Sequence, residues 1–303
     1  MPRIFTKRLS MKRKHQGYRE DLIGYLFILP VFLGVAFFIF YPFGYSFIST
    51  FKNWSGLRSL ADSRWVNFEM YKRVLSDNLF WKAFGNTLIT LIGVPIGLAI
   101  SIFLALLLNR GLKGTQVYRV IFYIPVVSSL TAIIILWRGM LAVEGPLNDV
   151  LAVFRIKAIN WLGEPTYARI GLIGMCVWKG LGVSILFYIA GLQGISESYK
   201  EAARIDGAND WQIFWKITLP LLRPTTFFMI VTGIINGMQL YVEPDLLLNG
   251  GPGNATTTLV LYLFNRFEAR RISEASVVAW ILALFIFIVT TIQFVYNNRR
   301  EKA

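Results

Sequence analysis

The stretch AFGNTLITLIGVPIGLAISIFLALLLN, residues 83–109, decides the fold. It carries no charged side chain, and it is longer than the roughly 20 residues that a helix needs to cross a hydrocarbon core about 30 Å thick. Over the whole chain, 55% of the residues are hydrophobic and only 16% are charged, whereas soluble domains carry about 25% charged residues. The sequence therefore predicts an all-α, polytopic membrane protein.

Six runs of this kind predict six membrane-spanning helices. Five of them are free of charge, namely 22–51, 83–109, 120–137, 224–242 and 275–298, and the sixth, 170–196, is interrupted only by Lys179. Residues 246–265 are also uncharged, but the Asn249–Asn254 stretch NGGPGN would break a helix, so we expect a loop followed by a shorter helix there. The predicted spans are 22–47, 84–108, 118–138, 170–192, 224–247 and 275–297, in one transmembrane domain, 22–298, between tails at 1–21 and 299–303.

The distribution of lysine and arginine predicts the orientation. With an even number of spans both ends share one side, and the segments on that side hold 17 Lys and Arg in 67 residues, against 13 in 98 on the other. Because positive charge accumulates on the cytoplasmic side, we expect both termini in the cytoplasm. This rule also accounts for most of the net charge of +14 without a nucleic-acid partner, and the basic tail would lie on anionic membrane lipid.

The residue inventory excludes several kinds of chemistry. Cys176 is the only cysteine and His15 the only histidine, which rules out an internal disulfide, Ser–His catalysis and a histidine-based metal site. The phosphate-binding motif G-x-x-x-x-G-K-[ST] is absent. We therefore predict no enzymatic activity, no catalytic residue and no cofactor for this chain, which would not hydrolyse ATP by itself.

The predicted inside segment, 193–223, carries the features of two short helices. Ser198 and Glu201 have the spacing of a capping box, Gly207 is suited to end the first helix, and Asn209 to cap the second. A following Leu-Pro pair is expected to stop that second helix. Its face carries the aromatic residues Trp211, Phe214 and Trp215, which a partner or the membrane surface would have to cover.

Seven residues of this segment form a pattern with fixed spacing: Glu201, Ala202, Ala203, Gly207, Ile217, Leu219 and Pro220. This pattern resembles the EAA loop of permease subunits of binding-protein-dependent ABC importers. The resemblance implies an all-α fold of six transmembrane helices with a two-helix coupling loop that docks on a cytoplasmic ATPase. The alternative for Glu201 is a purely local capping role.

Three further stretches resemble the carbohydrate-uptake branch of that family, including subunits of the maltose-permease and glycerol-phosphate-permease types. The resemblance implies a bacterial cytoplasmic-membrane protein that pairs with a second permease subunit. Its other implied partners are two ATPase subunits, which would hold ATP and Mg, an external solute-binding protein and a carbohydrate substrate. The stretches are Asn67-Phe68-x-x-Tyr71, Asn86-Thr87-Leu88 and Gly250–Thr256.

Polar residues recur at helical spacing in the predicted fifth span. Such residues at membrane depth face other helices or a water-filled path, so interhelical hydrogen bonding and the lining of a substrate path both remain open. For Glu243, packing, gating and loop anchoring are further alternatives. The stripe consists of Thr225, Met229, Thr232, Asn236, Gln239 and Glu243.

Lys179 is the remaining candidate, because a lysine deep in a span costs about 2.5–3.5 kcal/mol. We expect it to pair with Glu243 or Asp245, with direct substrate contact as the alternative.

The amides in the stripe favour a neutral sugar as the substrate, since amides both donate and accept hydrogen bonds. Excess positive charge outside leaves an acidic oligosaccharide or glycerol phosphate as the alternative substrate. An ion-gradient-driven transporter or channel is the rival from another class.

Overall fold

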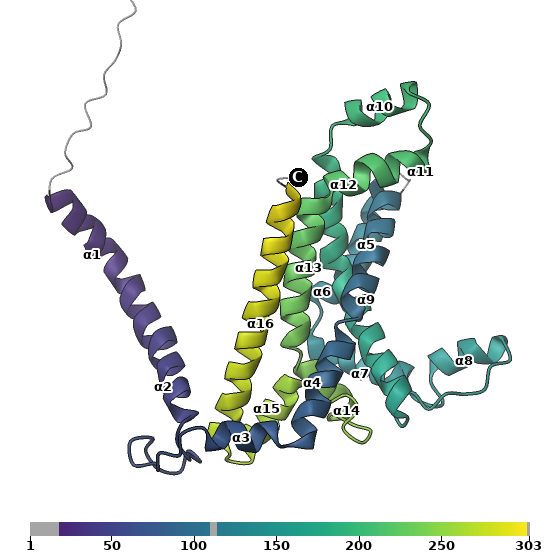
Figure 1. Ribbon diagram of the computed structural model, residues 1–303. Coiled ribbons are helices and arrows are strands. Elements are labelled where there is room, and N and C mark those ends of the chain that lie inside the picture. Colours follow the sequence, from purple (N-terminus) through teal and green to yellow (C-terminus); the bar gives the residue numbers. More distant parts are fainter. Residues whose placement is uncertain (1–17, 110–113, 302–303) are drawn as a thin grey trace, which may run out of the picture. The chain divides into compact units, whose positions relative to one another are not determined.

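The computed structural model describes residues 18–109 and 114–301 (Figure 1). Most of the predicted basic tail, 1–21, and residues 302–303 of the predicted last tail lie outside the described residues. The chain divides into two compact units, one within residues 1–48 and the other within 49–303.

The first unit is one apolar helical rod. It consists of α1 (Tyr18–Val35), a π-helical turn η1 (Ala36–Phe40) and most of α2 (Tyr41–Ser49). Residues Ile23–Ser49 are long and apolar enough to cross a membrane, as the sequence predicts for 22–47.

The second unit contains all the remaining helices, and an isolated bridge between Lys52 and Trp65 is the nearest approach to a strand in the described ranges. The helices are α3 (Glu69–Leu75), α4 (Asn78–Thr90), α5 (Gly93–Asn109), α6 (Thr115–Val127), α7 (Leu130–Met140), α8 (Pro146–Val153), α9 (Pro165–Gln193), α10 (Glu197–Ile205), α11 (Asp210–Ile213), η2 (Phe214–Thr218), α12 (Leu219–Leu221), α13 (Arg223–Met238), α14 (Val242–Leu248), α15 (Leu259–Glu268) and α16 (Ile272–Glu301).

Four helical segments within the described ranges are long and apolar enough to be membrane spans, and two bent pairs bring the number to six if each pair is one span. This agrees with the predicted six-span, all-α fold. The long segments are Ile23–Ser49, Asn78–Asn109, Pro165–Gln193 and Ile272–Arg299, and the bent pairs are Thr115–Val127 with Leu130–Met140 and Asp210–Leu221 with Arg223–Met238.

The prediction of one continuous helix over 118–138 is wrong. α6 and α7 meet at 103°, because Ser128 adopts an extended conformation (ψ 150°) and Ser129 follows it (ψ 128°). The Ser128 hydroxyl donates to the Ile124 carbonyl at 2.7 Å, the kind of side-chain bond by which serine competes with helical backbone bonds.

The predicted fifth span, 224–247, is likewise not one helix. α13 ends at Met238, and Tyr241 (φ −132°, ψ −58°) separates it from α14. The Leu240 carbonyl in this break accepts a hydrogen bond from the Thr258 hydroxyl at 2.6 Å. A hydroxyl from the loop before α15 thus provides a hydrogen-bond donor for a carbonyl that has no partner within a helix.

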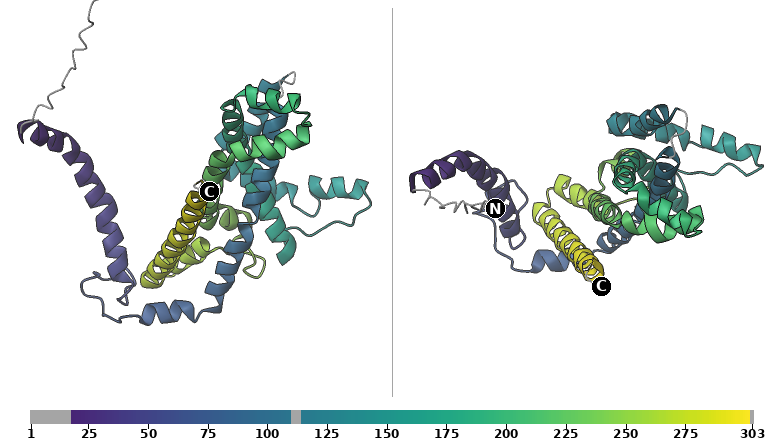
Figure 2. Two further views of the ribbon diagram at one scale, coloured as in Figure 1. Left: turned by 45° about the horizontal axis from the view of Figure 1, so that its top comes forward. Right: turned by 90° about the horizontal axis from the view of Figure 1, so that it is seen from above.

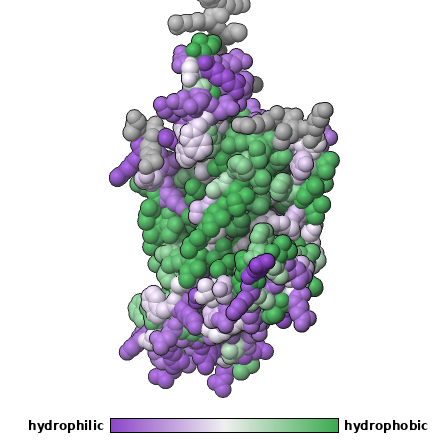
Figure 3. Space-filling model, turned by 90° about the vertical axis from the view of Figure 1, so that its right-hand side faces the viewer, coloured by the Kyte–Doolittle hydropathy of each residue, from purple (hydrophilic) through white to green (hydrophobic). Residues whose placement is uncertain are grey.

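The helices of the second unit pack side by side, with α5 along α9 and α13 against both (Figure 2). Gly182 on α9 allows α6 to come close, since a Cβ there would lie 2.3 Å from the Phe122 carbonyl oxygen. The buried contact between α5, α9 and α13 includes Ala105, Ile185, Tyr188 and Met229. Figure 3 shows hydrophobic side chains across the middle of one face, with hydrophilic ones gathered at the ends.

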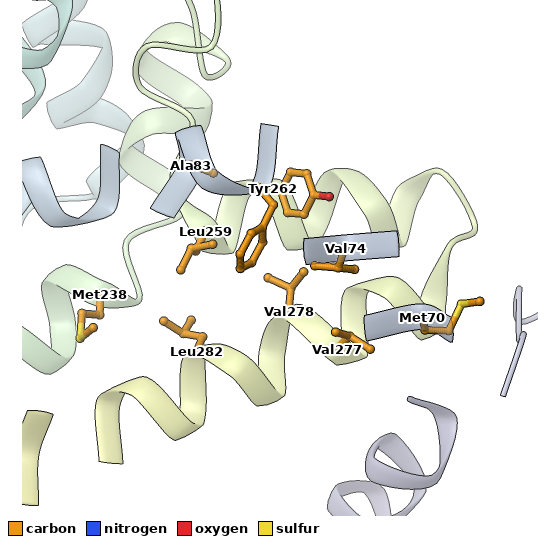
Figure 4. Packing of buried hydrophobic residues seen from close by; sticks show 10 residues of the cluster. Met70, Val74, Ala83, Met238, Leu259, Tyr262, Val277, Val278 and Leu282 are labelled. Carbon is orange, nitrogen blue, oxygen red and sulfur yellow. The ribbon is translucent and has the colours of Figure 1, made fainter. Parts of the chain in front are cut away.

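A second buried cluster lies where α3, α4 and α15 meet the start of α16 (Figure 4). Tyr262 and Phe80 pack edge to face within it, with ring centroids 6.1 Å apart. Val277 and Val278 of α16 are fully buried there. This cluster is at the end of the second unit opposite α10 and α11 (Figure 1).

Candidate functional site: coupling segment and polar cavity

The coupling segment, residues 193–223, projects from one end of the second unit (Figure 1). Its first helix, α10, contains no buried residue. Its exposed side chains include Tyr199, 58% accessible, and Ile205, 87% accessible. The rest of this chain therefore leaves α10 uncovered.

Gly207 ends α10, as the sequence predicts. Its φ of +79° lies in the left-handed region that glycine adopts without steric cost. The backbone N–H groups of Asp206 and Ala208 donate to the carbonyls of Ala202 and Ala203 at 3.0 and 2.9 Å, which satisfies the end of the helix. A Cβ at this glycine would meet no atom of this chain within 4 Å.

The predicted capping box between Ser198 and Glu201 is wrong. The helix begins two residues earlier than expected, with Ser196 at the N-cap, and the Ser196 hydroxyl contacts the Ser198 hydroxyl at 2.7 Å. Glu201 is exposed and makes no hydrogen bond or ion pair with any described residue. The local role that competed with docking is therefore absent, and this carboxylate is free to meet a partner.

The second half of the coupling segment is anchored to the bundle. Asn209 and Gln212 form the expected cap at its start, with reciprocal bonds of 2.9 Å. Ile213 and Thr218 are buried. The second helix ends at Leu221, directly after the predicted stop at Leu219-Pro220, and the chain turns by 63° into α13.

Three aromatic rings cluster on this half. Trp211 and Trp215 are 68% and 50% accessible, and their centroids are 5.6 Å apart. Phe214 lies 5.2 Å from Trp215. Of the other matched positions, Ala202 is exposed, and Ala203, Ile217, Leu219 and Pro220 are partly buried.

A cavity of about 770 Å³ lies between α5, α9 and α13, with contributions from α6 and α14. Its polar lining comes from hydroxyl and amide side chains and one ion pair, and the remainder is apolar. Phe187 and Phe228 border it with ring centroids 5.3 Å apart. The polar lining residues are Thr90, Ser184, Thr232, Asn236 and Gln239, with Lys179 and Glu243 as the ion pair.

Five members of the predicted stripe line this cavity, although they do not share one helix. Thr225 does not line it and lies instead against Gly191 of α9. The Thr232 hydroxyl donates to the Phe228 carbonyl at 2.8 Å. The side-chain amides of Asn236 and Gln239 are exposed and make no hydrogen bond within the described ranges, so both are free to bind a hydroxyl-rich ligand.

Lys179 forms an ion pair with Glu243, the first of the two predicted carboxylate partners. The ammonium comes from the middle of α9 and the carboxylate from the first turn of α14. The Lys179 side chain is 32% accessible, whereas that of Glu243 is 8% accessible. The pair thus faces the cavity mainly through its lysine.

A polar network around Asn86 connects segments of the second unit at the end opposite α10 and α11. The Asn86 amide donates to the carbonyls of Asn254 and Thr257 at 2.8 and 3.0 Å. Its oxygen accepts from Arg169 at 3.1 Å, and Arg169 also donates to the Ala255 carbonyl at 3.0 Å. Two stretches that the sequence analysis singled out, around Asn86 and around Gly250, are thereby joined to each other and to α9.

Phe187 and Phe228 in the cavity and Arg169 in the network are among the residues that the sequence did not single out. Phe187 lies eight positions after Lys179, and Phe228 four before Thr232, so helical spacing alone would have placed both beside the candidates already chosen. Arg169 had no such signal, because its partners are 83 and 86 residues away.

An ion cluster lies near this network at the same end. Asp77 accepts hydrogen bonds from the Tyr262 hydroxyl at 2.7 Å and from Arg266. Burial raises the pKa of Asp77, but the bonds from Tyr262 and the Leu79 N–H, together with the charge of Arg266, outweigh this effect and lower it below its usual value. Burial, followed by the bond to Asp77, raises the pKa of Tyr262.

The sequence profile of a protein family matches residues 93–302, which is more than half of the chain. Its description is "Binding-protein-dependent transport system inner membrane component". The chain belongs to this family. This chain is therefore a multi-pass membrane protein, a permease whose transport system depends on a binding protein.

Related permeases match at least 90% of the chain. "Lactose transport system permease protein LacF" of Rhizobium radiobacter is 33% identical over 306 residues, covering 98% of this chain and 99% of that protein. "Trehalose/maltose transport system permease protein MalF" of Thermococcus litoralis is 33% identical over 283 residues, covering 90% and 93%. "Probable ABC transporter permease protein YesP" of Bacillus subtilis is 34% identical over 292 residues, covering 94% and 93%.

A solved structure shares the permease fold. It is a chain of "a bacterial ABC transporter involved in the import of the acidic polysaccharide alginate", with a TM-score of 0.80 and 22% identity, covering 93% of this chain and 96% of that one. At this identity the likeness supports the fold alone.

Proposed function

We propose that this permease forms half of the translocation pathway for a carbohydrate and is driven by a separate ATPase that docks on the coupling segment. The observation that carries the proposal is the connection between two sites. The coupling segment turns directly into α13, and α13 carries Thr232 and Asn236 into the cavity. A displacement of the coupling segment would therefore move α13, and with it the cavity residues Thr232 and Asn236.

The cavity has the chemistry of a sugar site. The unpaired amides can donate to and accept from sugar hydroxyls, and the hydroxyl oxygens of Thr90, Ser184 and Thr232, which donate to helix carbonyls, can still accept. Phe187 and Phe228 offer apolar ring faces beside them. The names of the lactose and trehalose/maltose permease relatives, at 33% identity over nearly the whole chain, support the same substrate class.

The remaining partners and the orientation belong to the same proposal. A second permease subunit would complete the pathway, two ATPase subunits would bind ATP and Mg, and the binding protein would deliver the sugar at the end that holds Asn86 and loop 249–258. The coupling segment and both termini would then lie in the cytoplasm, which agrees with the higher density of lysine and arginine on that side. Family membership favours this arrangement over an ion-gradient-driven transporter.

Charge reversal at Glu201 tests the docking. Glu201→Lys should weaken binding of the ATPase at least about tenfold, equivalent to about 1.4 kcal/mol, because a free carboxylate that pairs with a basic group would become repulsive. Co-purification with the ATPase and sugar-stimulated ATP hydrolysis are the measurements. Glu69→Lys is the control, since it makes the same change on a half-exposed residue of α3 at the opposite end.

Substitution of Gly207 distinguishes its role in ending α10 from a role in docking the ATPase. Asparagine tolerates the left-handed conformation, and its side chain would meet no atom of this chain around the Cβ, so Gly207→Asn should fold normally. If the ATPase occupies that space, the variant will still lose transport. Wild-type uptake by both Gly207→Asn and Glu201→Lys would rule out docking at this segment.

A further inference from the structure

The cavity holds a single pair of opposite charges. Among the described residues that line it, Lys179 and Glu243 are the ones with charged side chains, and they neutralise each other. The other polar lining groups are uncharged hydroxyls and amides. The cavity therefore carries no net charge, although it contains a lysine.

The two partners differ in how they meet the cavity. Glu243 is almost fully buried, while about a third of the Lys179 side chain is accessible. If the carboxylate were neutral, the accessible group would be an unpaired ammonium next to Asn236 and Gln239. A lysine of this kind attracts a carboxylate or phosphate group strongly where solvent is partly excluded.

The pair adds little as a connection between α9 and α14. These helices already share a buried apolar contact through Leu172, Met175 and Leu247. Replacing a buried ion pair by apolar residues of similar volume is often neutral or stabilising. What the pair contributes beyond apolar packing is a fixed arrangement of charge inside the cavity.

We infer that Glu243, by pairing with Lys179, makes the cavity accept neutral carbohydrates and disfavour acidic ones. This inference rests on the proposed function, since it assumes that the cavity takes a carbohydrate. The pair is then a determinant of charge specificity: the lysine is held away from anionic substrates by the buried carboxylate. Loss of the carboxylate alone would convert the cavity into one that prefers a uronic acid.

The test is direct ligand binding to the assembled transporter without the binding protein, so that selection by the binding protein does not intervene. The two probes are a neutral hexose trisaccharide and a uronic-acid trisaccharide of the same length, measured by calorimetry at one salt concentration. The quantity of interest is the ratio of the two dissociation constants. Glu243→Gln should shift this ratio toward the acidic probe at least tenfold.

Three further variants separate charge from packing. Lys179→Met with Glu243→Gln removes both charges and should restore the wild-type ratio. The swap Lys179→Glu with Glu243→Lys keeps the cavity neutral and should also restore it. Glu69→Gln adds the same net charge to the chain outside the cavity, in the exposed pair with Arg73, and should leave the ratio unchanged.

The outcomes distinguish this inference from the proposed function. If the wild-type complex binds neither probe, the carbohydrate role of the cavity is wrong and the inference falls with it. If the wild type binds the neutral probe but Glu243→Gln leaves the ratio within threefold, the cavity is a sugar site and the pair does not set its charge preference. If Glu69→Gln shifts the ratio equally, the effect comes from overall charge and the inference is wrong.

Discussion

Asn86 joins three separate parts of the chain, so its removal should have a large effect. Asn86→Ala deletes two hydrogen bonds to carbonyls of the 249–258 loop and one from Arg169. A neutral hydrogen bond contributes about 0.5–1.5 kcal/mol and one to a charged group about 1.5–3 kcal/mol, so the three total roughly 2.5–6 kcal/mol. Because Asn86 is only 5% accessible, water cannot easily replace the lost partners.

The assay has a global and a local part. Unfolding by SDS in mixed micelles should show the destabilisation of Asn86→Ala. A single cysteine at Ala255, which is 1% accessible in the folded protein, in a Cys176→Ala background, should react with a thiol reagent at least tenfold faster when Asn86 is replaced, since 1.4 kcal/mol of lost local stability corresponds to that factor.

A matched substitution serves as the control. Asn236→Ala makes the same change at an exposed amide that has no hydrogen-bond partner within the described ranges, and it should alter neither readout. The reasoning is refuted if Asn86→Ala stays within about 0.5 kcal/mol of the wild type, the range of ordinary surface substitutions, or if the two variants are equally destabilised.

Two other predictions concern the orientation and the acid stability. Single cysteines at Asp62 and Asn254 should label with an impermeant thiol reagent in intact cells, whereas one at Arg204 should label only after permeabilisation; labelling at Arg204 in intact cells would reverse the proposed orientation. Because the pKa of Asp77 is lowered in the folded protein, its ion cluster stabilises the fold above the usual carboxyl pKa and should lose this contribution as the pH falls below about 4. The midpoint of thermal unfolding should therefore drop more steeply between pH 5 and 3 in the wild type than in Asp77→Asn, and equal slopes would contradict this.

Charge-free length predicts where helices cross a membrane better than where they bend. Residues 84–108, 170–192 and 275–297 all fall inside long helices of the structure. The bends after Val127 and Met238 depend on what receives the freed backbone groups, such as the Thr258 hydroxyl at Leu240. A contact between residues 18 positions apart cannot be read from local composition.

The cavity was predictable in its residue types and not in its geometry. Helical spacing selected Asn236, Gln239 and Glu243 as one stripe, yet the helix ends at Met238 and a separate helix brings Glu243 back to the same space. The cost of a lone lysine in a span pointed to its carboxylate partner, because such a charge has to be neutralised. The amide network at Asn86 had no comparable energetic signal, since asparagine is tolerated in many environments.

The break between α13 and α14 gives α13 the properties of a lever with its pivot at the cavity. A helix of 16 residues is about 24 Å long, so a 10° swing about Gln239 would move its coupling end by about 4 Å. The far network, which lies beyond the pivot, would stay in place during such a swing. Motion at the coupling end would then alter the width of the cavity without disturbing the network around Asn86.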